Sequence, residues 1–151
     1  MRLLIQRVLK SDVTVDGKII GEIGKGLLIL VGIENEDTEE DIEWLSKKAS
    51  QLRIFDDENG VMNKSVMDID GEVLIISQFT LMAQTAKGNR PSYIKAAKPD
   101  ISRGLYEKFC ANMSQKLGKN VETGQFQADM KVSLINDGPV TIWMDSKNKN
   151  Y

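Results

Sequence analysis

The stretch that decides the fold is Lys131-Val132-Ser133-Leu134-Ile135-Asn136-Asp137-Gly138-Pro139-Val140-Thr141-Ile142-Trp143-Met144, which reads as one strand with a proline inside it. Because proline has no N–H to give to a neighbouring strand, within a sheet it occurs at an edge, at a strand's first residue or in a bulge. The sequence therefore predicts that the Gly138-Pro139 unit presents bare carbonyl oxygens outward.

A second polar segment follows a strongly apolar one. Val73-Leu74-Ile75-Ile76 runs into Ser77-Gln78-Phe79-Thr80-Leu81, which brings two hydroxyls and an amide to the end of a buried strand. Polar residues also occur wherever a strand reaches water, and Gly-Pro also occurs in ordinary turns. From residue types alone, a small polar site and a purely structural reading both remain open.

Length and composition indicate one domain, residues 1–151. The chain has 151 residues, of which 41% are apolar, enough for one core and too few for two ordinary domains. Its longest apolar run, Leu27 to Ile33, is far shorter than the roughly 18 residues that a membrane helix needs. The first residues lack the apolar region and cleavage site of a signal peptide, so we expect a cytoplasmic protein without a membrane partner.

The side chains that the sequence lacks exclude several kinds of catalytic and metal site. The chain contains no histidine, which removes the commonest general base and most zinc sites. Its single cysteine, Cys110, lies in a helical apolar pattern and reads as a buried residue. No glycine-rich nucleotide fingerprint is present. We therefore expect no metal and no cofactor, and chemistry based on hydroxyls, carboxylates, main chain or substrate groups.

Charge is unevenly distributed along the chain. The net charge of −2 argues against a general nucleic-acid coat. However, residues 34–43 hold seven acids and no base, whereas residues 87–103 hold one acid and five cations, Lys87, Arg90, Lys95, Lys98 and Arg103. The second segment is either a locally positive face or an ordinary solvated loop.

The predicted elements make an α+β domain. Short strands run from Arg2 to Ile33 with an Asp16-Gly17 hairpin turn, and Asp37 with Glu40 marks the start of an amphipathic helix. A buried strand over Val73 to Met82 precedes a loop and a second helix from Asp100 to Leu117. The acidic cluster at 56–60 reads as a turn. This order predicts a largely antiparallel, barrel-like sheet with two main helices.

The sequence resembles the D-aminoacyl-tRNA deacylase family over nearly its whole length. Matching blocks occur in one order, and they are Gln6-Arg7-Val8, Gly24-x-Gly26-Leu27-Leu28, Leu52-Arg53-Ile54-Phe55, Met62-Asn63-x-Ser65, Ser77-Gln78-Phe79-Thr80-Leu81, Lys87-Gly88-x-Arg90-Pro91-Ser92, Val121-Glu122-Thr123-Gly124, Ala128-Asp129-Met130-Lys131-Val132 and Asn136-Asp137-Gly138-Pro139-Val140-Thr141. The resemblance implies an enzyme that hydrolyses the ester between a D-amino acid, or glycine, and the 3′ end of tRNA.

The resemblance also implies an obligate homodimer with its active site at the dimer interface. Gly138-Pro139, with a cis peptide bond, would reach from one subunit into the partner's pocket and reject L-amino acids. The residues expected to carry catalysis are Ser77, Gln78, Phe79 and Thr80. The residues expected to discriminate D- from L-amino acids are Asn136, Gly138, Pro139, Val140, Thr141, Met130 and Arg7, the last two as supports of the Gly-Pro element.

The reaction route is open at the level of sequence. We favour attack by water, with backbone N–H groups near Phe79 and Thr80 stabilising the oxyanion, because no histidine can activate Thr80. A covalent Thr80 intermediate is the alternative route, and a non-catalytic RNA-binding or oligomeric scaffold is the alternative class. Candidate contacts to tRNA phosphates are Lys87, Arg90, Lys95, Lys98 and Arg103.

Overall fold

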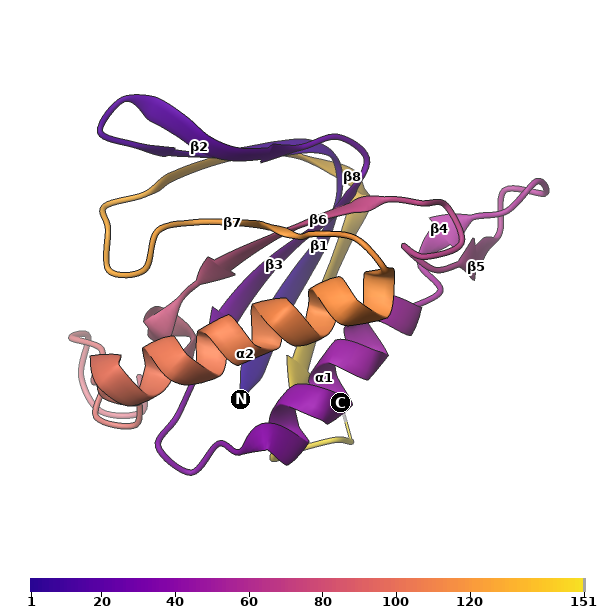
Figure 1. Ribbon diagram of the computed structural model, residues 1–151. Coiled ribbons are helices and arrows are strands. Elements are labelled where there is room, and N and C mark those ends of the chain that lie inside the picture. Colours follow the sequence, from indigo (N-terminus) through magenta and orange to yellow (C-terminus); the bar gives the residue numbers. More distant parts are fainter. Residues whose placement is uncertain (151) are drawn as a thin grey trace.

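The computed structural model describes residues 1–150. Figure 1 shows two helices lying side by side on one face of a strongly curved sheet, with a small two-stranded arm projecting at one end. The elements are β1 (Arg2–Val15), β2 (Lys18–Ile23), β3 (Gly26–Gly32), α1 (Glu39–Gln51), β4 (Phe55–Asp56), β5 (Met62–Lys64), β6 (Glu72–Ser77), the 3-10 helix η1 (Phe79–Met82), α2 (Pro99–Leu117), β7 (Glu122–Thr123) and β8 (Lys131–Asp145).

The sheet is built around the long strand β1. On one side, β1 pairs antiparallel with β3 through its first half and with β2 through its second half. On the other side it pairs antiparallel with β8, which has no further partner strand in the described chain and so forms an edge. This placement is one of the three that the sequence left open for the strand with the internal proline.

The largely antiparallel sheet predicted from the sequence is wrong in one half of the molecule. β6 pairs parallel with β3, and β7 pairs parallel with β6, so the sheet is mixed. The reason is that α1 lies between β3 and β6 in the chain, and α2 lies between β6 and β7. A helix that crosses over the sheet returns the chain to the same end and makes the next strand parallel.

Two apolar clusters hold the single domain together. Alternate residues of β3, such as Leu27 and Ile29, pack with the helices in the larger cluster, which includes Phe109 and Leu45. Leu28, on the opposite face, packs in a smaller cluster with Leu74, Ile76, Val8, Val13 and Ile23. The sheet curls around this second cluster until β2 lies close to β7. The distance is short enough that a Cβ on Gly21 would lie 3.0 Å from the carbonyl oxygen of Thr123. The sheet is therefore nearly closed.

The start of α1 differs from the sequence prediction. α1 is capped by Thr38 and Asp41 rather than by Asp37 and Glu40, because the Asp41 carboxylate accepts the Thr38 N–H at 2.8 Å. The Asp37 carboxylate instead accepts hydrogen bonds from the Met1 ammonium and, at 2.8 Å, from the Glu34 N–H.

The strand predicted over Val73 to Met82 is also shorter. β6 ends at Ser77, and the chain continues as η1. The polar segment therefore sits on a turn of helix at the end of the strand. Within residues 1–150, no helix is both long and apolar enough to cross a membrane.

Candidate active site

The segment Ser77–Thr80 is held at the carboxyl end of β6 by three contacts. The Gln78 N–H donates to the carbonyl of Val31 at 2.7 Å, and an Arg2 guanidinium nitrogen donates to the carbonyl of Leu81 at 2.9 Å. Gly32 permits the close packing, because a Cβ there would lie 2.8 Å from the Leu81 Cβ and 3.2 Å from the Gln78 oxygen. Arg2 and Gly32 were not singled out from the sequence, since their role depends on the fold.

A cleft of about 680 Å³ opens beside this segment. Ser77, Gln78 and Phe79 form one wall, and Met130 lies on another. The wall also includes Tyr93, Lys98, Ser102, Phe126 and Asp129. Mostly apolar walls with a few polar groups are typical of small-molecule sites. Four of these residues, Tyr93, Ser102, Phe126 and Asp129, were not predicted, although Asp129 stands next to Met130 in a block that resembles the deacylases.

An aromatic pair marks the mouth of the cleft. The rings of Phe79 and Tyr93 meet edge to face, with centroids 5.1 Å apart and an interplanar angle of 71°. Both side chains are exposed. Tyr93 belongs to the loop of residues 83–98, whose base is closed by two backbone hydrogen bonds between Gln84 and Ser92, of 2.8 and 3.0 Å. The contact therefore links the position of this loop to the polar segment.

The surroundings of Thr80 do not provide a base. Its hydroxyl accepts a hydrogen bond from the Gln78 side-chain amide, and an amide cannot take up a proton from a nucleophile. In contrast, the N–H groups of Phe79 and Thr80 donate to no oxygen within residues 1–150. Two neighbouring N–H groups without partners are what an oxyanion site requires.

The Gly138-Pro139 element is a bulge in the edge strand β8. Gln6 pairs with Thr141 and Val8 pairs with Asn136, so the four residues 137–140 stand opposite a single residue of β1. The Gly138-Pro139 peptide bond is cis, as the resemblance implies, and both residues are exposed.

Asn136 closes the base of this bulge. Its side-chain oxygen accepts the Val140 N–H at 2.9 Å, and its side-chain nitrogen donates to the Val140 carbonyl at 3.1 Å and to the Thr141 hydroxyl at 3.2 Å. Asn136, Val140 and Thr141 therefore act together on the shape of the bulge within this chain.

Arg7 holds the bulge from below. Its side chain is buried, and its Nε donates to the carbonyl of Asp137 at 3.0 Å. A terminal nitrogen donates to the carbonyl of Ile54 at 2.6 Å, and the carboxylates of Asp137 and Asp56 lie at 3.3 and 3.6 Å. One guanidinium thus joins the bulge to the start of the β4–β5 arm. Arg7 contacts the bulge, whereas Met130 lies in the cleft wall.

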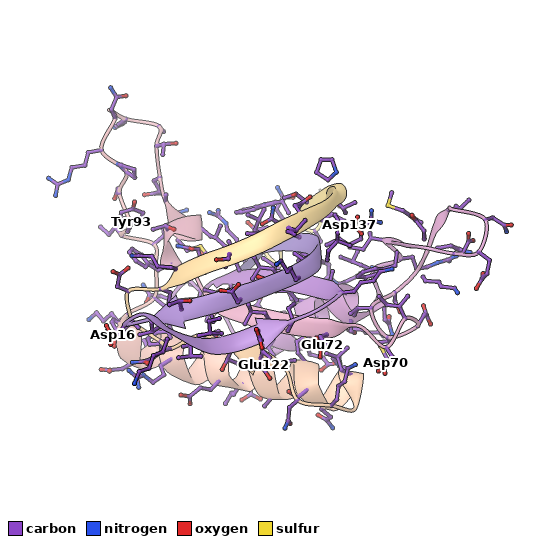
Figure 2. The ribbon with its side chains drawn as sticks, turned by 90° about the horizontal axis from the view of Figure 1, so that it is seen from above. Asp16, Asp70, Glu72, Tyr93, Glu122 and Asp137 are labelled. Atoms are coloured by element: carbon purple, nitrogen blue, oxygen red, sulfur yellow. The ribbon has the colours of Figure 1, made fainter. Side chains whose placement is uncertain are left out.

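One chain does not bring the two halves of the predicted site together. None of residues 136–141 lines the cleft. Figure 2 shows Asp137 and Tyr93 well apart, toward opposite ends of the molecule. The bulge therefore lies outside the cleft of its own chain.

The remaining predicted residues lie at the surface or in the core. Lys87, Arg90, Lys95 and Lys98 are all exposed, and none makes an ion pair within residues 1–150. Arg103 lies on α2 against the Phe126 ring, 5.1 Å from its centre. Cys110 is buried as expected, and burial raises the pKa of its thiol to about 12, so it is not a nucleophile at neutral pH.

The chain is similar to known deacylases over its full length. A family model described as D-Tyr-tRNA(Tyr) deacylase matches residues 4–145. Proteins named D-aminoacyl-tRNA deacylase from Bacteroides thetaiotaomicron and Parabacteroides distasonis are 64% and 62% identical over 149 residues, with 99% of each chain covered. The chain belongs to the D-aminoacyl-tRNA deacylase family. This result confirms the resemblance drawn from the sequence blocks.

Solved structures share the fold of this deacylase family member. A protein described as c-Myc DNA Unwinding Element Binding Protein matches with a TM-score of 0.91 at 40% identity, covering 96% of this chain and 98% of its own. A structure described as a probable eukaryotic D-amino acid tRNA deacylase matches with a TM-score of 0.81 at 17% identity, covering 95% and 97%. The second likeness concerns the fold alone.

Proposed function

We propose that the chain hydrolyses the ester bond of D-aminoacyl-tRNA, and of glycyl-tRNA, to release the free amino acid and tRNA. Membership of the deacylase family supports this reaction class. The observation that carries the proposal is the pair of neighbouring N–H groups at Phe79 and Thr80 that have no acceptor within residues 1–150, since Phe79 lines the apolar cleft and Thr80 follows it in the chain. These N–H groups would donate hydrogen bonds to the carbonyl oxygen of the ester as that oxygen gains negative charge. Because charged tRNA is used in the cytoplasm, we also propose that location.

The complete site, in this proposal, is shared by two copies of the chain. The Gly138-Pro139 bulge is exposed and lies outside its own cleft, so a homodimer in which each bulge enters the partner's cleft would unite the two halves. Carbonyl oxygens of this bulge would then lie beside the substrate Cα. They would clash with the side chain of an L-amino acid whatever its identity, and they would tolerate a D-amino acid or glycine.

Water is the nucleophile in the proposed reaction. It attacks the ester carbonyl, the Phe79 and Thr80 N–H groups stabilise the oxyanion, and the 2′-OH of the terminal ribose assists proton transfer to the leaving oxygen. One oxyanion donor contributes about 2.7–4 kcal/mol of transition-state stabilisation. Gln78 orients the Thr80 hydroxyl, and Ser77 completes the wall that positions the ester.

Replacing Thr80 by alanine separates the two reaction routes. We expect Thr80→Ala to retain hydrolysis within about tenfold of the unmodified protein, equivalent to at most about 1.4 kcal/mol, because the backbone N–H groups remain. Single-turnover rates on D-tyrosyl-tRNA measure this. Complete loss of turnover with unchanged tRNA binding would instead establish the covalent route through Thr80.

Hydrolysis of one tRNA charged with D-tyrosine or with L-tyrosine tests the proposed function. We expect multiple turnovers on the D-form and a rate on the L-form at least about 100-fold lower, since a steric clash of about 2.7 kcal/mol suffices for that ratio. Glycyl-tRNA should be cleaved, because glycine has no side chain to clash. Equal rates on D-tyrosyl-tRNA and L-tyrosyl-tRNA would refute the proposed rejection of L-amino acids.

The alternative class is a non-catalytic nucleic-acid-binding protein. The exposed cations of residues 87–98 favour it, as does the similarity to a protein described as binding a DNA unwinding element. Catalytic release of D-tyrosine excludes it. In our proposal Lys87, Arg90, Lys95 and Lys98 contact tRNA phosphates without reading bases, so binding should weaken as salt rises.

A further inference from the structure

The β4–β5 arm carries an exposed apolar tip. Val61 and Met62 are 57% and 52% exposed, although both are large apolar residues. Asp56 and Glu58 stand next to them with side chains that are 55% and 78% exposed. The arm projects from the body of the domain (Figure 1) and packs on nothing at its tip within the described chain. Neighbouring exposed apolar residues of this kind mark an interaction surface.

Arg7 fixes this arm to the Gly138-Pro139 bulge. The same guanidinium binds the carbonyl of Ile54, at the start of the arm, and the carbonyl of Asp137, at the start of the bulge. The arm and the bulge are therefore attached to the same buried side chain. Any surface that receives the bulge must have a second surface beside it that receives the arm.

Twofold symmetry identifies that second surface. In a dimer with one axis the same patch serves both copies, so the neighbours of the bulge in one copy face the neighbours of the cleft in the other. The arm lies beyond Asp137 at one end of the molecule, and the loop of residues 83–98 lies at the other end, beyond the cleft (Figures 1 and 2). When a bulge enters the partner's cleft, the arm reaches this loop.

The loop and the arm are complementary in character. Ile94 is 80% exposed and Tyr93 is 38% exposed, so the loop offers an apolar tip like that of the arm. Residues 87–98 carry four exposed cations without ion pairs in the described chain, whereas the arm carries three acids at residues 56–58, two of which also pair within the chain, Asp56 with Arg7 and Glu58 with Lys64. Opposite charges around an apolar centre are typical of a specific interface.

We propose that the β4–β5 arm of each copy binds the loop of residues 83–98 of the partner, with Val61 and Met62 packed against Tyr93 and Ile94. This inference rests on the shared site of the proposed function. The arm thereby contributes to the partner's site, because Tyr93 contacts Phe79 and so transmits the position of the loop to the oxyanion donors. The tip cations Lys87 and Arg90 stay available for tRNA.

Cysteine crosslinking tests the contact directly. In the double variant Met62→Cys, Ile94→Cys, a short bis-maleimide should join two chains, because the two positions lie at opposite ends of one chain and adjoin only across the dimer. We expect roughly a tenfold excess of covalent dimer over either single variant, since neighbouring thiols have a high effective concentration. The matched control is Lys108→Cys with Ile94→Cys, which places the first thiol on exposed α2. Buried Cys110 is present in every variant, so the single variants report its background.

The outcomes separate this inference from the proposed function. A dimer in sedimentation that hydrolyses D-tyrosyl-tRNA but gives no excess of crosslink would overturn the arm contact alone, and would leave tRNA as the partner of the loop. A crosslinked dimer without hydrolysis would support the contact and refute the function. A monomer at working concentration would overturn both.

Discussion

Gly138→Ala is expected to lower kcat/KM on D-aminoacyl-tRNA by about 100-fold or more, equivalent to about 2.7 kcal/mol. In the proposed dimer, a Cβ at this position would enter the partner's cleft. The structure gives a different reason within the chain itself. A Cβ on Gly138 would lie 2.9 Å from a terminal nitrogen of Arg7 and 2.9 Å from a methyl carbon of Val140.

The backbone of Gly138 adds to this effect. Its φ of +129° is one that residues with a Cβ rarely adopt. Alanine therefore forces the bulge to move away from Arg7, and the carbonyl oxygens of residues 138 and 139 move with it. The expected result is a loss of both rate and discrimination between D- and L-tyrosyl-tRNA, measured on the same preparation.

A matched glycine distinguishes a local change from general strain. Gly17 also has a positive φ, +75°, but a Cβ there would have no atom within 4 Å. Gly17→Ala should reduce stability by about 1 kcal/mol through backbone strain alone and leave activity per folded molecule unchanged. If Gly138→Ala also kept the original rate and selectivity, the bulge would have no part in the reaction.

Because proline has no N–H to give to a neighbouring strand, the sequence limited Gly138-Pro139 to an edge, a strand's first residue or a bulge, and the structure has a bulge in an edge strand. The parallel pairing of β3, β6 and β7 was not predicted, because the hairpin signals before residue 27 were taken to apply to the whole chain. The uninterrupted apolar runs Leu27–Val31 and Val73–Ile76 carried the missing information. Strands buried on both faces are typical of parallel pairs, and the two runs pair parallel.

The candidate site was predicted in part for a similar reason. Ser77–Thr80 and Gly138-Pro139 are contiguous motifs, so their residues could be named from the chain. Their supports are distant in sequence: Arg7 meets Ile54 and Asp137, and Tyr93 meets Phe79. Such contacts depend on how strands and loops pair, which no local pattern records. The start of α1 was misplaced by one residue, because both Asp37 and Thr38 are suitable caps and the Met1 ammonium binds Asp37.

Replacing Arg7 by alanine is the second change with a large expected effect. It removes the donors to the carbonyls of Ile54 and Asp137, and leaves the first without a partner at a buried position and the second without one at a partly buried position. We expect a loss of about 3 kcal/mol in the free energy of unfolding, because each hydrogen bond from a charged donor contributes about 1.5–3 kcal/mol. For a chain of this size the melting temperature should fall by roughly 6–12 °C.

Activity should fall further than stability explains. At a temperature where Arg7→Ala is folded, we expect at least about a 100-fold lower kcat/KM, since the bulge loses its attachment and the barrier rises by about 2.7 kcal/mol. Arg53→Ala is the matched control, because Arg53 is exposed and donates one bond, from Nε to the carbonyl of Asn63 at 2.9 Å. Its loss should change the rate by less than about threefold, as for an exposed surface bond.

Arg7→Lys decides whether geometry or charge is responsible. A lysine keeps the positive charge near Asp56 and Asp137 but has one compact donor group, which cannot bridge two carbonyls as the guanidinium fork does. We therefore expect the lysine variant to recover part of the stability but little of the activity or of the discrimination between D- and L-tyrosyl-tRNA. Full recovery by lysine would show that Arg7 supplies only charge. The position of the Gly138 carbonyl would then not depend on the fork, and the rigid link from arm to bulge would have to be abandoned.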